Sequence, residues 1–227
     1  MKKIKILLSF LVLFAFASCT NWNYIDTGVH DPHEFDNVSM YDYLKANSKQ
    51  FYLTTALIDR AGLQDLFMGK DPAHKRIMFF APTKYAIAAG MIRKDYAKTP
   101  LNDANGELWD FDYLKDIENI PVDVCRSIIL SYTFDKVYMR DEFPRGQRGE
   151  GEELMQGGEI LKSINGNEIW IYRQQTSYGN FTDIPVNTIV GIEQGTNTDL
   201  YLTSTDHTVA NGVVHALVDG FMIKDLK

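Results

Sequence analysis

Two histidines are the residues of this chain whose spacing could most simply hold a metal ion. His30 and His33 flank Asp31-Pro32, which places two imidazoles and a carboxylate within four residues. The proline disfavours the helix that would align the imidazoles, and no further cluster of metal-ligating residues follows them. We therefore expect a linker at this position, with a metal site as the alternative.

The other reactive side chains do not form a pattern typical of an enzyme. The sequence has no glycine-rich phosphate loop, no serine elbow and no Cys-x-x-Cys, and its acidic residues are too dispersed to nominate a catalytic pair. Cys125 stands among aliphatic residues, where a lone thiol is usually an inert small hydrophobe. His215 follows Val213 and Val214 on a predicted strand, and we expect a core histidine that is hydrogen-bonded to a neighbouring loop. The sequence predicts no catalytic site, no cofactor and no metal.

The amino terminus predicts an exported protein. Met1 to Lys5 carries three lysines, and an apolar run from Ile6 to Ala17 follows, broken only by Ser9. This is the order of a signal peptide, and the run is shorter than the roughly 18 residues that a membrane-spanning helix needs. We assign residues 1–18 to the signal peptide.

The end of this signal resembles the lipobox of bacterial lipoproteins, because Phe16-Ala17-Ser18 precedes Cys19. The resemblance implies that Cys19 becomes the first mature residue and that acyl chains on it, such as palmitate, hold the protein to the membrane. Thr20 is not the aspartate that retains enteric lipoproteins in the inner membrane, so the outer membrane is expected, on a face that the sequence leaves open. The alternative is an ordinary signal peptide with an incidental cysteine.

The charge balance argues against nucleic acid as a partner. The formal net charge is −7, and it falls by three to −10 when the signal peptide removes Lys2, Lys3 and Lys5. Nucleic acid and anionic lipid both attract basic patches, so neither fits an acidic protein. Membrane attachment therefore depends on the acyl chains of Cys19.

The mature chain is expected to contain a linker and one domain. Residues 19–37 are polar and show no sustained apolar period, which is typical of a linker, and residues 38–227 form the domain. With Cys19 acylated, only Cys125 remains, so no internal disulfide can form. A chain with 45% hydrophobic residues can instead be stabilised by its core.

Periodicity predicts helices first and strands last. A helical period that begins at Ser39 predicts two helices, separated near Asn47. A buried strand from Arg76 to Ala81 then leads into a helix capped by Thr83. The last third alternates as strands do, including Val213 to Met222.

Two irregular segments are expected in that β-rich part. Asn211-Gly212 predicts a hairpin with a type I′ turn, because both residues tolerate positive φ. The segment Arg145 to Gly158 is rich in glycine and glutamate, so it predicts an exposed loop.

Three blocks of the sequence resemble the fasciclin domain family. They are Ala61-Gly62-Leu63-Gln64-Asp65-Leu66, a block from Phe79 to Ile87 that contains Phe80, Ala81, Pro82 and Thr83, and a block from Asn211 to Leu217 that contains Gly212 and His215. The resemblance implies an α+β fold, a fasciclin-like β-sheet wedge flanked by a helical group. It also implies a role in adhesion or protein interaction, with these motif residues acting mainly on the fold.

The chain also departs from the family pattern. Lys84 replaces the usual acid or amide, Thr133 replaces a histidine after Tyr132, and Asp219 stands one place later than expected. The chain has no Arg-Gly-Asp, only Arg148-Gly149-Glu150, so integrin-type adhesion is not carried over.

Two function classes follow from these observations. The first is a protein-interaction module, whose partner-binding candidates are Tyr132, Tyr138, Arg145, Arg148 and Glu150, at or near the predicted loop. The alternative for that loop is a solvated connector. The second class is a surface glycan binder that stacks sugars on the aromatic residues Trp22, Tyr24, Trp109, Trp170, Tyr172 and Tyr178.

Overall fold

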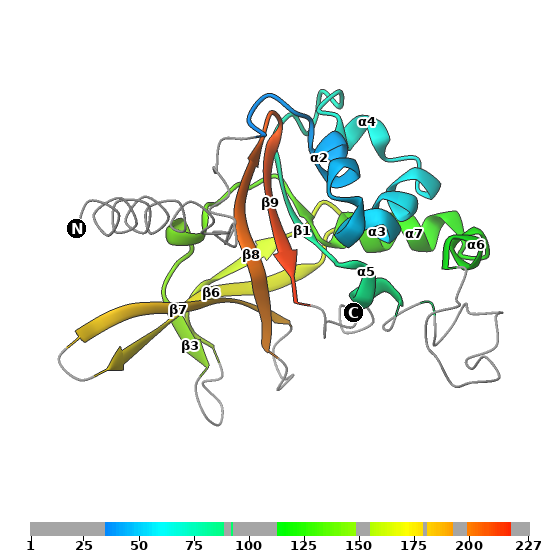
Figure 1. Ribbon diagram of the computed structural model, residues 1–227. Coiled ribbons are helices and arrows are strands. Elements are labelled where there is room, and N and C mark those ends of the chain that lie inside the picture. The colour runs from blue at the N-terminus through cyan, green and yellow to red at the C-terminus, as the bar shows by residue number, and fades with distance from the viewer. Residues whose placement is uncertain are drawn as a thin grey trace, which may run out of the picture. The chain divides into compact units, whose positions relative to one another are not determined.

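Most helices precede most strands along this chain (Figure 1). The computed structural model describes residues 35–88, 92, 113–148, 155–178, 181–192 and 199–218. Within these ranges, no helix has the length and apolar character that crossing a membrane requires. The element order confirms the predicted α+β class.

The helices form one group at the side of the sheet (Figure 1). They are α2 (Met40–Ala46), α3 (Ser48–Arg60), α4 (Gln64–Phe67), α5 (Lys84–Ile87), α6 (Tyr113–Glu118) and α7 (Val122–Ser131), and a 3-10 helix η2 (Arg140–Glu142) lies outside the group. The Ser39 side chain accepts a hydrogen bond from the Asp42 amide at 3.1 Å, which satisfies an amide that the first turn leaves free. Asn47 separates α2 from α3, so the predicted cap and break are both confirmed.

The strands form a mixed sheet with a bend at one strand. They are β1 (Ile77–Ala81), β2 (Thr133–Phe134), β3 (Gly146–Arg148), β4 (Met155–Gly157), β5 (Glu159–Lys162), β6 (Glu168–Tyr178), β7 (Phe181–Ile192), β8 (Asp199–Val209) and β9 (Gly212–Leu217). The described strands are ordered β2-β1-β9-β8-β7-β6-β5, with a separate β3-β4 pair. Residues 199–201 of β8 pair with β7, whereas Leu202–Val209 pair with β9. The two halves joined by β8 are the predicted wedge.

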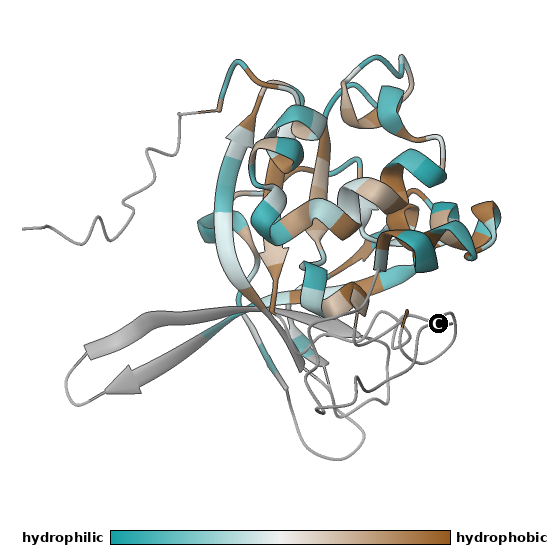
Figure 2. Cartoon of the chain, turned by 45° about the vertical axis from the view of Figure 1, so that its right-hand side comes forward, coloured by the Kyte–Doolittle hydropathy of each residue, from teal (hydrophilic) through white to brown (hydrophobic). Residues whose placement is uncertain are grey.

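Strands β1 and β9 run parallel, and all of their residues are buried. Most of these residues are hydrophobic, the brown end of the scale in Figure 2. On the helical face, Phe79 packs edge-on against Phe67 with ring centroids 4.9 Å apart. On the other face, Phe80 lies 6.4 Å from Phe143, measured between ring centroids. The alternation predicted for Val213 to Met222 is therefore wrong within β9, because all six of its residues are buried and, apart from His215, they are apolar, as expected of a strand covered on both faces.

The outer face of β1 and β9 is covered by an irregular segment, Asp135–Pro144, which we call the covering segment. It includes η2 and follows β2. The Arg140 amide donates to Asp206 Oδ1 of β8 at 2.6 Å, and the Pro144 carbonyl accepts from the Arg173 amide of β6 at 2.8 Å. These bonds fasten the segment to both halves of the wedge.

The turn between β8 and β9 lies one residue earlier than predicted. Val209 pairs with Gly212, so Ala210 and Asn211 form the turn. Asp206, not Asn211, is the described non-glycine residue with positive φ, so the type I′ assignment is wrong. Gly212 is needed for another reason: a Cβ there would lie 1.8 Å from the carbonyl oxygen of Ile77.

The segment predicted as an exposed loop is structured at both of its ends. Gln147 of β3 pairs with Gln156 of β4. A Cβ at Gly146 would lie 2.7 Å from Tyr172 Cβ, and one at Gly158 would lie 2.4 Å from Trp170 Nε1. The prediction is therefore wrong for these ends, whose glycines permit close packing; residues 149–154 lie outside the described part.

The folded part also includes residues that the sequence assigns to the linker. The ring of Phe35 packs on Tyr43 with centroids 4.9 Å apart. Asp36 accepts a hydrogen bond from the Thr208 hydroxyl of β8. The domain therefore includes these residues, before the predicted boundary at 38.

The close approach of β9 to β1 makes Gly212→Ala strongly destabilising. We expect this variant to lose about 3 kcal/mol or more of unfolding free energy, because its Cβ overlaps backbone atoms that cannot move aside. Gly62→Ala is the matched control: its φ is +65° but its Cβ would meet nothing within 4 Å, so about 1 kcal/mol is expected. Urea unfolding of both variants checks this, and equal losses would contradict the assigned role of Gly212.

Candidate functional site

The residues at the end of β1 bind the strand to the helical group. The Thr54 hydroxyl of α3 donates to the Pro82 carbonyl at 2.5 Å. The Thr83 side chain accepts from the Ala86 amide at 3.4 Å, which confirms the predicted cap of α5. The motif residues Phe80, Ala81, Pro82 and Thr83 are all buried. Their contacts stabilise the fold and present no group to a ligand.

Asn211 is also buried, and its side chain binds two helices. Its Oδ1 accepts from the Met40 amide at the start of α2 at 2.8 Å, and its Nδ2 donates to the Phe67 carbonyl of α4 at 3.0 Å. The Asn211 carbonyl accepts from the Ile77 amide of β1 at 3.0 Å. Asn211, in the turn between β8 and β9, therefore binds two helices and strand β1.

His215 connects β9 to the covering segment. Its side chain is fully buried. Nε2 lies 2.9 Å from the Tyr138 carbonyl, and the Asp206 amide donates to Nδ1 at 3.2 Å. These contacts match the expected core histidine hydrogen-bonded to a neighbouring loop.

The two partners of His215 determine where its proton lies. A carbonyl only accepts and an amide only donates, so Nε2 carries the proton, Nδ1 does not, and the ring is neutral. Burial lowers the pKa of His215 to about 4, although the Tyr138 carbonyl and the Asp206 carboxylate oppose this shift. The imidazole is thus a neutral structural link at pH 7.

The other reactive side chains do not assemble a metal site in the described part of the chain. Cys125 is buried, and burial raises the pKa of its thiol. No group of three or more His, Cys, Asp or Glu that could hold a metal ion occurs among the described residues. Cys19, His30 and His33 lie outside them.

The described part of the chain does not place all of the partner-binding candidates on an accessible surface. Tyr132 is 1% exposed, so its ring is in the core and is not accessible to a partner. Arg145 is exposed beside the β3-β4 pair, and the backbone of Arg148 lies in β3. The side chain of Arg148 and all of Glu150 lie outside the described part.

Tyr138, the remaining candidate, is engaged within the protein. Its hydroxyl donates to Glu159 Oε2 at 2.6 Å. Burial and this bond raise the pKa of Tyr138, while hydrogen bonds from Lys136 and then Tyr138 lower the pKa of Glu159. The residue fastens the covering segment to β5.

The aromatic residues of β6 are stacked but covered. Trp170 and Tyr172 have ring centroids 4.1 Å apart and planes at 27°, on the face of β6 opposite Ile169 and Ile171. Trp170 is 5% exposed and donates from Nε1 to the Gly157 carbonyl at 3.0 Å. The pair therefore offers no open surface to a sugar. Trp22, Tyr24, Trp109 and the side chain of Tyr178 lie outside the described part.

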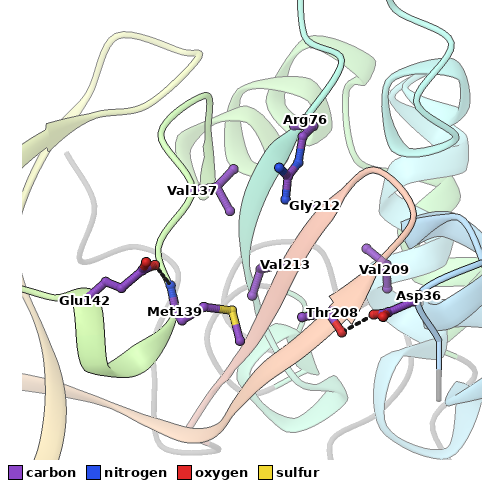
Figure 3. Close-up of a pocket in the computed structure, with 9 residues that line it drawn as sticks. All are labelled: Asp36, Arg76, Val137, Met139, Glu142, Thr208, Val209, Gly212 and Val213. Atoms are coloured by element: carbon purple, nitrogen blue, oxygen red, sulfur yellow. Dashed lines mark hydrogen bonds between the residues drawn. The ribbon is translucent and has the colours of Figure 1, made fainter. Parts of the chain in front are cut away.

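A groove opens on the outer face of the sheet, between the covering segment and the β8-β9 hairpin (Figure 3). Its volume is about 550 Å³, within the usual range for ligand sites. It is lined by Asp36, Arg76, Val137, Met139, Glu142, Thr208, Val209, Gly212 and Val213. This groove is the candidate binding site.

The groove exists because the chain leaves β1 after a very short pairing. Only Thr133 and Phe134 of β2 pair with β1, at Phe79 and Met78. The chain then diverges, and it returns to the sheet where Tyr138 meets His215. The space between these two attachments is bordered by Val137 and Met139, with Val213 of β9 at its centre (Figure 3).

Two of the three charged side chains at the groove are used within the protein. Asp36 accepts from Thr208, and Glu142 Oε2 accepts from the Met139 amide at 2.7 Å. Arg76 is exposed, and no described residue gives it a hydrogen bond or an ion pair. Its guanidinium therefore remains available for an external anionic group.

Sequence reasoning did not identify this groove. Its lining comes from four separate stretches of chain, and no motif links them. The sequence feature that could have indicated the groove is Arg76, a charged residue directly before a buried strand.

Comparisons with known proteins find similarity among solved structures. No protein-family model matches the chain, and no curated protein matches it. The chain is similar to a solved fasciclin domain pair from the insect cell adhesion molecule fasciclin I, with 16% sequence identity and a TM-score of 0.41. The match covers 76% of this chain and 44% of the other, so this chain spans less than half the length of that one.

The neutral state of His215 predicts a loss of stability in acid. The unfolded chain, with a histidine pKa near 6.5, binds a proton that the folded chain binds only near pH 4. The free energy of unfolding should therefore fall by about 3 kcal/mol as pH drops from about 6.5 to about 4. His215→Gln keeps a donor for the Tyr138 carbonyl but does not titrate, so this part of the pH dependence should disappear. Urea unfolding at several pH values measures it; the same slope in both proteins would refute the assignment.

Proposed function

We propose that this protein is a lipid-anchored bacterial envelope protein whose fasciclin-like domain binds a protein partner in the groove on its outer face. The observation that carries the proposal is the groove itself, with aliphatic residues in its interior and, at its edge, an arginine that has no partner among the described residues. Small apolar sites with a few polar groups around them are typical of recognition.

The groove lining favours binding over catalysis. It contains no histidine, cysteine or serine. The hydroxyl of Thr208 donates to Asp36, and Glu142 caps η2 through the Met139 amide. The Thr208 hydroxyl and the Glu142 carboxylate are thus held by other groups of the protein.

The motif resemblance supports a domain of the fasciclin type, in which interaction is the implied role. The positions that carry the resemblance, including Thr83, Asn211 and His215, stabilise the fold here. Of the three motif blocks, only Gly212 and Val213 contribute to the groove lining, and its other seven residues lie outside them. Partner choice therefore depends mainly on residues outside the motifs.

The proposed location depends on Cys19. The lipobox resemblance supports acylation there and attachment to the outer membrane, and residues 20–34 would then separate the domain from the bilayer. An acidic protein needs such an anchor, because its own charge does not attract anionic lipid.

A glycan ligand is supported less well. Trp170 and Tyr172, whose side chains are the described ones among the residues predicted to stack on sugars, face each other and are covered. The groove is lined by aliphatic and charged side chains and has no aromatic ring. Stacking on sugars would need such a ring.

The anchor is tested by replacing Cys19 with serine. We expect Cys19→Ser to lose acyl labelling and to leave the outer membrane fraction, because the thiol that would carry the lipid is removed. Radiolabelled palmitate and fractionation of envelopes measure the two effects. Unchanged labelling and unchanged outer membrane recovery would show that the lipoprotein assignment is wrong.

The binding function is tested by photo-crosslinking in living cells. A photoreactive amino acid at Val137, in the groove, should give a discrete adduct with an envelope protein. The same amino acid at Ile160 of β5, which is 51% exposed and does not line the groove, is the matched control and should give none. No adduct at Val137, or equal adducts at both positions, would contradict the proposed function.

A further inference from the structure

We propose that the groove binds an extended peptide segment in which a single carboxylate adjoins an aliphatic side chain. The carboxylate pairs with Arg76, and the aliphatic side chain lies against Val213 and Met139. This inference rests on the proposed function and specifies the chemistry of the partner.

The charge of the partner follows from the three charged groups at the groove. Asp36 and Glu142 each hold an internal hydrogen bond, whereas Arg76 has no hydrogen bond or ion pair with any described residue. An arginine presents a planar set of donors that matches a carboxylate in two parallel bonds. Arg76 can therefore pair with the two oxygens of one carboxylate of the partner.

The carboxylates of Asp36 and Glu142 limit the partner segment to one carboxylate. Figure 3 shows Arg76 at the end of the groove near Val137 and Gly212, and Glu142 and Asp36 on the two sides away from it. A second acid placed farther along the groove would meet these like charges and lose affinity. The partner segment therefore carries one carboxylate at the Arg76 end and no other acid across the groove.

The apolar part of the partner follows from the interior of the groove. Val137, Met139, Val209 and Val213 contribute its aliphatic and thioether surface. A volume of about 550 Å³ accepts one or two side chains of a peptide. A thioether adapts its shape to different aliphatic groups, so leucine, isoleucine and methionine are all suitable.

A long acyl chain fits this lining poorly. Asp36, Thr208 and Glu142 interrupt the apolar surface, so methylene groups beyond the first few would contact polar atoms. A peptide avoids this cost because its backbone amides can form hydrogen bonds with such groups. The mixed lining therefore favours a peptide over a lipid.

The test uses defined peptides and the full chain purified in detergent. The probes are the blocked tetrapeptide Ala-Leu-Glu-Ala and its counterparts with glutamine or lysine in place of glutamate. Methyl-labelled methionine reports binding through the resonance of Met139, which lines the groove. We expect the glutamate peptide to shift this resonance and to bind roughly tenfold more tightly than the glutamine peptide, with no binding of the lysine peptide.

Two variants make the test specific. Arg76→Glu should weaken the glutamate peptide at least roughly tenfold, because it replaces the guanidinium with a like charge. Lys75→Glu makes the same charge change at the neighbouring exposed residue, which does not line the groove, and should change affinity less than about twofold. Thermal melting of both variants checks that the fold is intact.

Several outcomes would overturn the inference. They are equal affinities for the three peptides, no shift of the Met139 resonance with any of them, and equal effects of the two variants. If Val137 still crosslinks to an envelope protein in such a case, the binding function stands and only the inferred partner chemistry fails. Absence of that adduct together with selective peptide binding would instead count against the function in cells and leave the groove chemistry in place.

Discussion

The fold depends on the polar contacts of one buried asparagine. Asn211 supplies an acceptor to the start of α2, a donor to the end of α4 and a backbone acceptor to β1. These groups are remote in sequence, and two of them, the Met40 amide and the Phe67 carbonyl, depend on the Asn211 side chain. An aliphatic residue at this position would leave the Met40 amide and the Phe67 carbonyl without these bonds. The next residue, Gly212, then allows the backbone of β9 to approach Ile77. The helical group and the central strands are thus fixed relative to each other at one turn.

The outer face of the sheet depends on a second buried polar residue, His215. It is the neutral ring, protonated on Nε2, that joins the Tyr138 carbonyl to the Asp206 amide. Asp206 can offer its amide because it adopts φ of 66° within an irregularity of β8. An L-residue in this region is strained, and aspartate is among those that tolerate it best. The covering segment is therefore held by a specific protonation state and a local distortion, rather than by an additional strand.

The sequence predicts those features whose causes are local. Ser39 and Thr83 cap helices because a hydroxyl near free amides is sufficient, and β1 is a continuous apolar run because both of its faces are covered. The turn before Gly212 was misplaced by one residue because the decisive contact, with the carbonyl of Ile77, comes from a distant segment. Tyr132 was predicted to bind a partner but is buried, because its position depends on how the end of α7 packs in the tertiary structure. Such packing is also a contact between distant segments. The groove could not be predicted because it lies where a strand pairing ends.

The side chains of Asn211 and His215 hold the fold together, whereas Arg76 borders the groove, so binding specificity can change without loss of the fold. Asn211 and His215 are buried and fully engaged, so their replacement would affect the fold before it affected binding. Arg76 is exposed and has no partner among the described residues, so its replacement would cost the fold little. The lining can therefore change its charge while the attachments of the covering segment keep the groove open. A family motif can for this reason identify the scaffold and still carry little information about the partner, which depends on the side chains between those attachments.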